Sequence, residues 1–438
     1  QGDVDEVWDR FADKISIIYK EYIPVSKSGP RRFNTSWINE ESLTALLRKR
    51  RLWKKYKYCR SPRNKGNYEE AKKTANQLVR HAKLEYEKSI AIKMKEDSKI
   101  FWKYVQSKTK TKEDIPCIKD DEGNIHLDNK VKAELLNNFF QSVFTIEDNS
   151  QEITDFHKKK QTRPSYSVRF NANKVREYLE KLKETKSPGP DQMHPKFIKE
   201  TAKCISIPIT TIFNKSMDSM KIPEMWKLAN VTPLHKKGPK HQVSNYRPIS
   251  LTSIICKTME KFIRDALTKH MENNQLFTPH QHGFRKGRSC VTQLIEVLDD
   301  WTEKLDHHNA IDAIYLDFQK AFYTVPHKRL IHKLRGYGIT GNLLGWIKNF
   351  LNERKQKVVL NGAESNWSHV TSGIPQGSVL GPILFTIYIN DLPDVVDNIA
   401  KLFADDTKVY AVVNNIEEQD ILQKDLDNLM DWSDKWLL

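Results

Sequence analysis

The sequence predicts an α+β protein in which a mostly helical N-terminal region precedes alternating strands and helices. Residues 1 to about 110 are polar and show helical periodicity. From about Tyr166 onward, short apolar segments alternate with helices and with turns that contain Gly or Pro. Because 438 residues exceed one ordinary core, we expect three parts, namely a basic helical region at 1–145, a linker at 146–165 and an α+β region at 166–438.

The balance of charge indicates a polyanionic partner. The chain carries 72 Lys or Arg against 56 Asp or Glu, a net charge of +16, and nucleic acid is the leading candidate. No run of eighteen apolar residues is present, so we expect no membrane partner. The five cysteines are far apart and the histidines show no His-Glu-x-x-His pattern, which excludes a zinc site or a disulfide scaffold. We expect the cysteines to be reduced and mostly buried in an intracellular protein.

The N-terminal region contains a basic segment with interleaved aromatic residues. Residues 48–65 include ten Lys or Arg and no acid, together with Trp53, Tyr56 and Tyr58. Basic side chains neutralise phosphates, and aromatic rings stack on unpaired bases. A helix that docks an aromatic stripe on a core would have the same pattern, so both interpretations stay open.

Local patterns predict a hairpin and two helices in the segments that follow the basic segment. Residues 116–128 predict a hairpin with its turn at 122–124, and Asp128 is placed to cap a helix that continues to about residue 144. A further helix begins near Asn173, with its apolar stripe at every third or fourth residue, and is stopped by the Pro-Gly-Pro at 188–190.

Three acids stand in apolar surroundings that do not favour them. Asp317 lies near the C-terminal end of a predicted strand at 313–318, and a helix with Pro326 in its first turn follows. Asp405 and Asp406 lie between two short apolar segments, which predicts a hairpin with acids at its turn. An acid in such a place is costly unless it is paired or bound to a cation.

Asp317 and Asp405 on neighbouring strands could together hold two Mg²⁺ ions roughly 3.5–4 Å apart, the arrangement that drives in-line phosphoryl transfer. Because successive strand side chains point to opposite faces, we assign the bridging role to Asp405 and an outer role to Asp406.

A loop rich in Gly and Pro separates these acids. It reads "GIPQGSVLGP" over residues 373–382, and an apolar helix follows from about Pro382. Gly373 and Gly377 allow the backbone to approach a flat ligand closely, and Gln376 offers a donor and an acceptor. A plain turn before a helix would have the same composition, so the loop alone is only moderately specific.

The order of these motifs resembles the reverse transcriptases of non-LTR retrotransposons of the LINE-type, jockey-like family. The motifs "YLDFQKAF", "GIPQGSVLGP" and "FADD" follow one another, after "KSPGPDQMHPKFIK" (186–199), "NYRPISLTSIICKTMEK" (245–261) and "QHGFRKGRSCVTQL" (281–294). The resemblance covers about 260 residues. It implies the fingers and palm of a right-hand polymerase with an antiparallel palm sheet.

The resemblance also implies roles for individual residues. Asp317, Asp405 and Asp406 match the catalytic, metal-binding carboxylates. Phe322 matches the aromatic gate that repels a ribose 2′-OH, a selection by repulsion. The family's nucleotide-contacting and template-contacting positions fall on the following residues: Gln376 and Gly377 at the nucleotide, Lys236 and Arg247 at the triphosphate, and Arg285, Lys286 and Arg288 at the template backbone.

The implied reaction is RNA-directed DNA synthesis, in which a primer 3′-OH attacks a dNTP with the help of two Mg²⁺ ions, or Mn²⁺ as an alternative. The implied partners are an RNA template, a DNA primer or target, and dNTP. The implied location is intracellular, in the nucleus and in a cytoplasmic ribonucleoprotein.

The sequence departs from the family pattern in three ways. Tyr323 replaces an acid in "KAFYTV", and Gln192 replaces a turn glycine in "GPDQM". The sequence ends at "LMDWSDKWLL", within what would be the last palm helix. We therefore expect a fragment without the family's thumb and endonuclease, with weak or no activity in isolation.

Two alternatives remain. One is a group II intron-type maturase, which "FADD" together with "SGIPQGSVLGP" disfavours. The other is a domesticated or decayed copy that only binds RNA, which Tyr323 and the expected truncation favour and the complete set of three aspartates disfavours.

Overall fold

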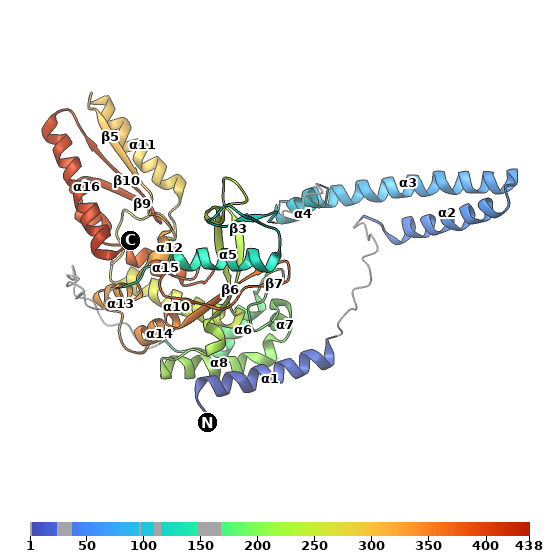
Figure 1. Ribbon diagram of the computed structural model, residues 1–438, viewed down its shortest axis with the longest axis horizontal. Coiled ribbons are helices and arrows are strands. Elements are labelled where there is room, and N and C mark those ends of the chain that lie inside the picture. The colour runs from blue at the N-terminus through green and yellow to red at the C-terminus, as the bar shows by residue number, and fades with distance from the viewer. Residues whose placement is uncertain (1, 24–36, 96–97, 109–114, 148–167) are drawn as a thin grey trace. The chain divides into compact units, whose positions relative to one another are not determined.

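The computed structural model describes residues 2–23, 37–95, 98–108, 115–147 and 168–438, which form two compact units (Figure 1). Unit 1 comprises Gln1–Ile17 and Ile115–Leu438, and unit 2 comprises Ile18–Asp114. The linker expected at 146–165 lies almost entirely outside the described residues, so the division into three parts stays a prediction. The mixed α and β composition expected from the sequence is confirmed.

Unit 2 is helical. Its helices are α2 (Glu40–Tyr58), α3 (Pro62–Lys93) and α4 (Ser98–Lys108). Asn39 caps α2 by accepting the Ser42 N–H, and Ser61 caps α3 by accepting the Asn64 N–H. These two caps fix the short connection that lets α2 and α3 pack along each other.

The aromatic residues of the basic segment contact α3. The ring of Trp53 lies 4.9 Å from the ring of Tyr68, and Tyr56 stacks on Tyr68 at 6.4 Å. Trp53 nevertheless remains 45% exposed and Tyr58 is 96% exposed. The segment therefore combines a packed aromatic cluster with rings that face solvent.

Unit 1 contains two larger sheets. One has the strand order β4–β3–β6–β7, with β8 also paired to β6, and its strands are β3 (Leu228–His235), β4 (Tyr246–Leu251), β6 (Arg354–Leu360), β7 (Ala363–Glu364) and β8 (Ser368–Val370). The β3–β6 pair is parallel and the other pairs are antiparallel. Helix α5 (Asn129–Ser142) packs on this sheet through Leu136 and Phe140, which join Val231 and Val358 in one apolar cluster.

The other sheet is antiparallel throughout. It has the order β5–β10–β9, formed by β5 (Ile311–Leu316), β9 (Ile399–Phe403) and β10 (Asp406–Val412). Helices α11 (Cys290–Asp306) and α16 (Ile416–Trp436) pack against it (Figure 1). The predicted strand at 313–318 is thus displaced toward the N-terminus, and Asp317 follows β5 directly.

Most of the remaining elements contribute to the main core of unit 1, whereas β1 and η1 join the apolar cluster of α5. The remaining elements are α1 (Val4–Tyr22), β1 (Ile118–Lys119), β2 (Ile125–His126), α6 (Ala172–Glu180), α7 (Pro195–Glu200), α8 (Ala202–Ser219), α9 (Glu224–Lys227), η1 (Val243–Asn245), α10 (Ile254–Asn273), α12 (Ala321–Thr324), α13 (His327–Gly336), α14 (Gly341–Leu351), α15 (Gly381–Tyr388) and η2 (Leu392–Val395). The first part of α1 joins this core where Trp8 meets Trp226 edge to face at 5.1 Å. The buried face of α10 supplies nine of its residues to the interior.

The expectation that the cysteines are mostly buried is wrong. Only Cys256 is buried, whereas Cys59, Cys204 and Cys290 are exposed. Cys204 lies on a solvent-facing position of α8, whose inward positions are taken by larger apolar residues such as Ile205, Ile209 and Phe213, and Cys290 is the first residue of α11. Among the described helices, none is both long and apolar enough to cross a bilayer.

Candidate active site

Seven of the residues predicted from the sequence line a single cleft of about 600 Å³. They are Lys236, Arg247, Asp317, Phe322, Gln376, Asp405 and Asp406. This volume falls in the range of pockets that hold a small ligand. Residues up to 170 positions apart in the sequence are therefore brought to one surface, with cations on one side and carboxylates on the other.

The carboxylates lie at one end of the antiparallel sheet. Asp405 occupies the two-residue turn between β9 and β10, and Asp406 is the first residue of β10. Strand β10 pairs with β5 so that Thr407 is opposite Leu316, which makes Asp406 and Asp317 the next residues along their strands. The hairpin turn expected at 403–406 is confirmed.

The pKa of Asp405 is raised above its ordinary value. Partial burial is the main cause, the negative charges of Asp406 and Asp317 add to it, and Arg247 opposes it. The carboxylates therefore repel one another, and a bound divalent cation would relieve this repulsion.

The donor set suits Mg²⁺, which takes hard oxygen ligands. Among the residues that the structure describes, no group of three His, Cys, Asp or Glu is close enough to hold a metal ion by itself. Mg²⁺ in phosphoryl-transfer sites is usually bound by one or two carboxylates together with substrate phosphates and water. The residues present fit that mode of binding.

Two exposed cations face the carboxylates from the β3–β4 pair. Arg247 on β4 is opposite Leu234 on β3, and Lys236 follows β3, where its N–H donates to the Asn245 carbonyl at 2.8 Å. A guanidinium and an ammonium held this way can bind phosphate oxygens.

Phe322 is held between two other rings. It stacks on Phe385 at 4.4 Å with an interplanar angle of 21°, and it meets Phe284 edge to face at 6.2 Å. Its carbonyl accepts the Ile374 N–H at 2.7 Å. The ring is thus held in place at the wall of the cleft.

The glycine-rich loop is tied to β4. The Gln376 carbonyl accepts the Ser250 N–H at 2.8 Å. Gly377 has a φ of +116°, and a Cβ there would lie 2.6 Å from the Ser250 carbonyl oxygen, so only glycine fits. The buried Glu260 carboxylate accepts the N–H groups of Val379 and Leu380 at 2.6 and 3.1 Å, which anchors the other end of the loop.

Tyr323, which the sequence marked only as a departure from the family, lines the same cleft. Its hydroxyl group contacts the side-chain oxygen of Gln376 and lies 3.2 Å from the Pro248 carbonyl oxygen. Burial raises the pKa of the phenol, so Tyr323 stays a neutral donor.

The three predicted template contacts lie outside the residues that line the cleft. The Arg285 guanidinium lies 4.0 Å from the centre of the Phe277 ring, and Arg288 hydrogen-bonds the Pro279 carbonyl. Lys286 is exposed. Their assignment to a template stays a prediction.

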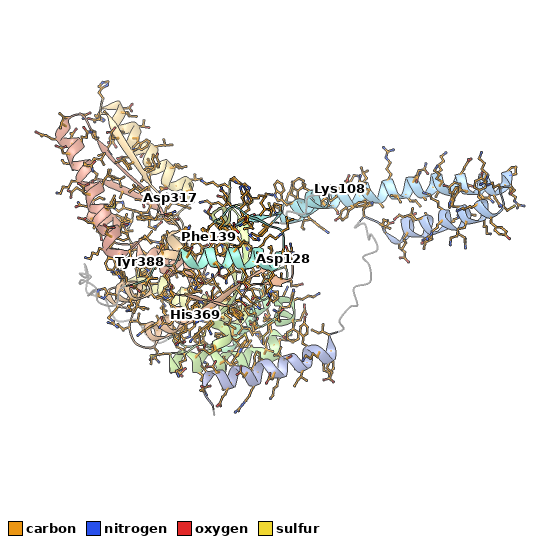
Figure 2. All side chains as sticks on the ribbon, in the orientation of Figure 1. Lys108, Asp128, Phe139, Asp317, His369 and Tyr388 are labelled. Atoms are coloured by element: carbon orange, nitrogen blue, oxygen red, sulfur yellow. The ribbon has the colours of Figure 1, made fainter. Side chains whose placement is uncertain are left out.

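Sequence reasoning missed the contribution of α5. Phe139, Phe140 and Val143 line the cleft, and the Lys320 ammonium lies 4.4 Å from the centre of the Phe139 ring. Figure 2 labels Phe139 on α5 and Asp317 at the end of β5. The apolar stripe of α5 was visible in the sequence, but its place beside the cleft depends on packing against a sheet formed a hundred residues later.

Comparison with known proteins shows what the segment that contains most of this cleft is similar to. Residues 234–438 match the family model described as "Reverse transcriptase (RNA-dependent DNA polymerase)". That segment contains every site residue predicted from the sequence, whereas Phe139, Phe140 and Val143 of the cleft lie before it.

Individual relatives show the same similarity. The chain is 30% identical over 278 residues to the probable RNA-directed DNA polymerase from transposon BS and 31% identical over 274 residues to that from transposon X-element, both of Drosophila melanogaster. It is 30% identical over 272 residues to the RNA-directed DNA polymerase from mobile element jockey of the same species. These alignments cover 60%, 61% and 60% of this chain but only 31%, 30% and 30% of the respective relatives. The resemblance to the reverse transcriptases of non-LTR retrotransposons is confirmed, and this chain spans about a third of the length of those relatives.

Proposed function

We propose that this chain carries the nucleotidyl-transfer site of an RNA-directed DNA polymerase of a non-LTR retrotransposon. In the proposed reaction, the 3′-OH of a primer attacks the α-phosphate of a dNTP, the bond to the β-phosphate breaks, and pyrophosphate leaves. The observation that carries the proposal is the convergence of three aspartates, two cations, the ring of Phe322 and Gln376 of the glycine-rich loop on one cleft.

The β5–β10–β9 sheet would be the palm, and the β4–β3–β6 sheet would belong to the fingers. Asp317 and Asp405 would hold the metal, with Asp406 in an outer role. Mg²⁺, or Mn²⁺ with the same ligands, would supply charge neutralisation on the transferred phosphate. Lys236 and Arg247 would bind the triphosphate, which places the α-phosphate between the cations and the carboxylates.

Phe322 would exclude a ribose 2′-OH, and Gln376 with Gly377 would contact the sugar and base of the incoming nucleotide. Arg285, Lys286 and Arg288 would contact the backbone of an RNA template, with a DNA primer or target as the other strand. Such an enzyme would act in the nucleus and in a cytoplasmic ribonucleoprotein.

The decisive test is primer extension on a poly(rA)/oligo(dT) substrate with the full-length protein (the parent) and its Asp405→Ala variant. We expect extension to fall by about a thousandfold or more in the variant, because loss of a metal ligand removes the main electrostatic contribution to transfer. Asp312→Ala, which removes an exposed carboxylate from β5 outside the cleft, is the matched control and should retain extension.

Equal extension by the parent and Asp405→Ala would show that the catalytic assignment is wrong. If both proteins bind RNA in a filter-binding assay and neither extends the primer, a role limited to RNA binding replaces the proposed function.

A further inference from the structure

Residues 279–283 lie against the outer edge of β9. The Leu402 N–H donates to the His280 carbonyl at 2.9 Å, and the His282 N–H donates to the Leu402 carbonyl at 2.8 Å. Gln281 and Leu402 form a parallel bridge between these two hydrogen bonds. The segment thus adds one short strand-like pairing to the sheet that carries the candidate carboxylates.

The side chain of Gln281 then bonds to the backbone of the hairpin turn itself. Its oxygen accepts the Ala404 N–H at 2.9 Å and the Gly283 N–H at 2.7 Å, and its nitrogen donates to the Ala404 carbonyl at 3.4 Å. Gln281 is only 1% exposed. One buried amide therefore satisfies both backbone groups of the residue that precedes Asp405.

The turn needs such support. Ala404 has a φ of +56°, in the left-handed region that a residue with a Cβ rarely occupies. A backbone in that conformation persists only when its surroundings hold it there. Because Asp405 is the next residue, any relaxation of Ala404 would move the Asp405 carboxylate.

Gly283 makes the contact sterically feasible. A Cβ at this position would lie 2.3 Å from the Ala404 nitrogen. The backbone of the loop can therefore approach the turn only because residue 283 has no side chain.

The same loop continues directly into the cationic residues Arg285, Lys286 and Arg288. Phe284, between them and Gly283, contacts the gate residue Phe322. The segment that would meet the template, the ring that would select the sugar and the turn that carries Asp405 are consequently joined through a few direct contacts.

We propose that Gln281 is a positioning residue for nucleotidyl transfer, which holds the Ala404–Asp405 turn in place and links it to the loop that carries Arg285, Lys286 and Arg288. The effect on catalysis that we infer rests on the proposed function. The contact itself can be tested separately.

The test uses Gln281→Met, which keeps the length of the side chain and removes its hydrogen bonds. We expect kcat for primer extension to fall about 10- to 100-fold, because a small displacement of a catalytic group has an effect of that size. The Mg²⁺ concentration for half-maximal activity should rise roughly tenfold, as when support for a metal ligand is removed. The Kd for the template–primer duplex should change less than about twofold, since the cations remain.

The matched control is Gln293→Met. Gln293 is a buried glutamine on α11 that has no hydrogen bond to the described hairpin turn.

Hydrogen–deuterium exchange provides a readout that does not depend on activity. The amides of Ala404 and Asp405 should exchange at least about tenfold faster in Gln281→Met than in the parent, while those in the middle of β10 stay protected. Gly283→Ala should have the same pattern, because its methyl group displaces the turn without changing the glutamine.

Parent-like kcat, Mg²⁺ dependence and exchange in Gln281→Met would overturn the inference. If the parent fails to extend primers, the proposed function fails, but faster exchange confined to the turn still supports the contact and unchanged exchange overturns it. If Gln281→Met does not fold, Gly283→Ala decides by the same measurements.

Discussion

At the scale of single residues, Tyr323 changes the chemistry of the cleft without adding a charge. Where the family commonly has an acid, this chain has a neutral phenol that contacts the Gln376 side chain and lies 3.2 Å from the Pro248 carbonyl. A phenol has one proton to donate, so the arrangement is satisfied when the Gln376 amide is turned to donate to the phenol and the phenol donates to Pro248. Tyr323 thereby fixes the orientation of Gln376.

We predict that Tyr323→Phe raises KM for dNTP by roughly 2- to 13-fold, which corresponds to the loss of one hydrogen bond of about 0.5–1.5 kcal/mol. The value of kcat should stay within about twofold, because the carboxylates are untouched. Steady-state single-nucleotide extension measures both quantities.

Tyr337→Phe is the control, since it removes a buried hydroxyl that accepts the Asn390 side-chain N–H outside the cleft. It should lower the melting temperature and leave KM unchanged. A decrease in KM for Tyr323→Phe would mean that the phenol competes with the nucleotide for Gln376.

At the scale of elements, features with a local cause could be predicted from the sequence. The β1–β2 hairpin, the capping of α5 by Asp128 and the β9–β10 hairpin all follow from turn chemistry within a few residues. The contact between Gln281 and Ala404 spans 123 residues and could not be predicted, because it depends on how β9 is placed in the sheet. The same reason applies to α5, whose apolar stripe was evident but whose partner sheet was not.

Helices α13, α15 and α16 meet around one buried cation. The Lys333 ammonium is fully buried, donates to the Tyr388 carbonyl at 2.7 Å and pairs with the Asp391 carboxylate at 2.5 Å. The ring centres of Trp436, Trp432 and Tyr388 lie 3.8, 4.5 and 4.8 Å away. Burial lowers the pKa of Lys333 to about 8, in spite of the charge of Asp391.

We predict that Lys333→Met lowers the free energy of unfolding by about 3–5 kcal/mol, because it leaves Asp391 without its buried partner. The folded-state pKa lies below that of the unfolded chain, so the unfolded chain binds more protons between about pH 8 and pH 10.5. Stability from this group therefore rises with pH in that window. The difference in stability between the parent and Lys333→Met should widen accordingly, as measured by urea unfolding at pH 7.5, 9 and 10.

Lys199→Met is the control, because the pKa of Lys199 is shifted in the opposite direction from that of Lys333. Lys199 pairs with Glu184 at the surface, and that hydrogen bond raises its pKa. Lys199→Met should change the free energy of unfolding only slightly, and this change should not grow between pH 7.5 and 10. If the difference in free energy of unfolding between the parent and Lys333→Met instead narrows as the pH rises, the prediction is wrong. The contacts of the charged ammonium would then stabilise the folded chain by more than burial of the charge destabilises it.

At the scale of the whole molecule, the positive charge is distributed over both units while the candidate cleft belongs to unit 1. All the residues of the cleft lie between positions 139 and 406. Unit 2 instead contributes residues 48–65, with ten Lys or Arg and no acid. Its aromatic cluster of Trp53, Tyr56 and Tyr68 accounts for part of that pattern by packing, whereas nine of the ten Lys and Arg side chains are exposed.

We predict that replacing the exposed Lys54, Lys55 and Lys57 together by Gln weakens the binding of single-stranded RNA and leaves the chemistry of the cleft intact. Each phosphate contact with a single strand contributes about −0.7 to the slope of log Kobs against log[salt], so loss of three contacts should reduce the steepness of that slope by about 2. Fluorescence anisotropy from 50 to 300 mM salt measures the slope. The matched control replaces three exposed lysines of unit 1, namely Lys174, Lys181 and Lys183. An equal reduction in both variants would mean that RNA responds only to the net charge of +16, whereas a reduction confined to unit 2 identifies the basic helix as a contact surface for RNA.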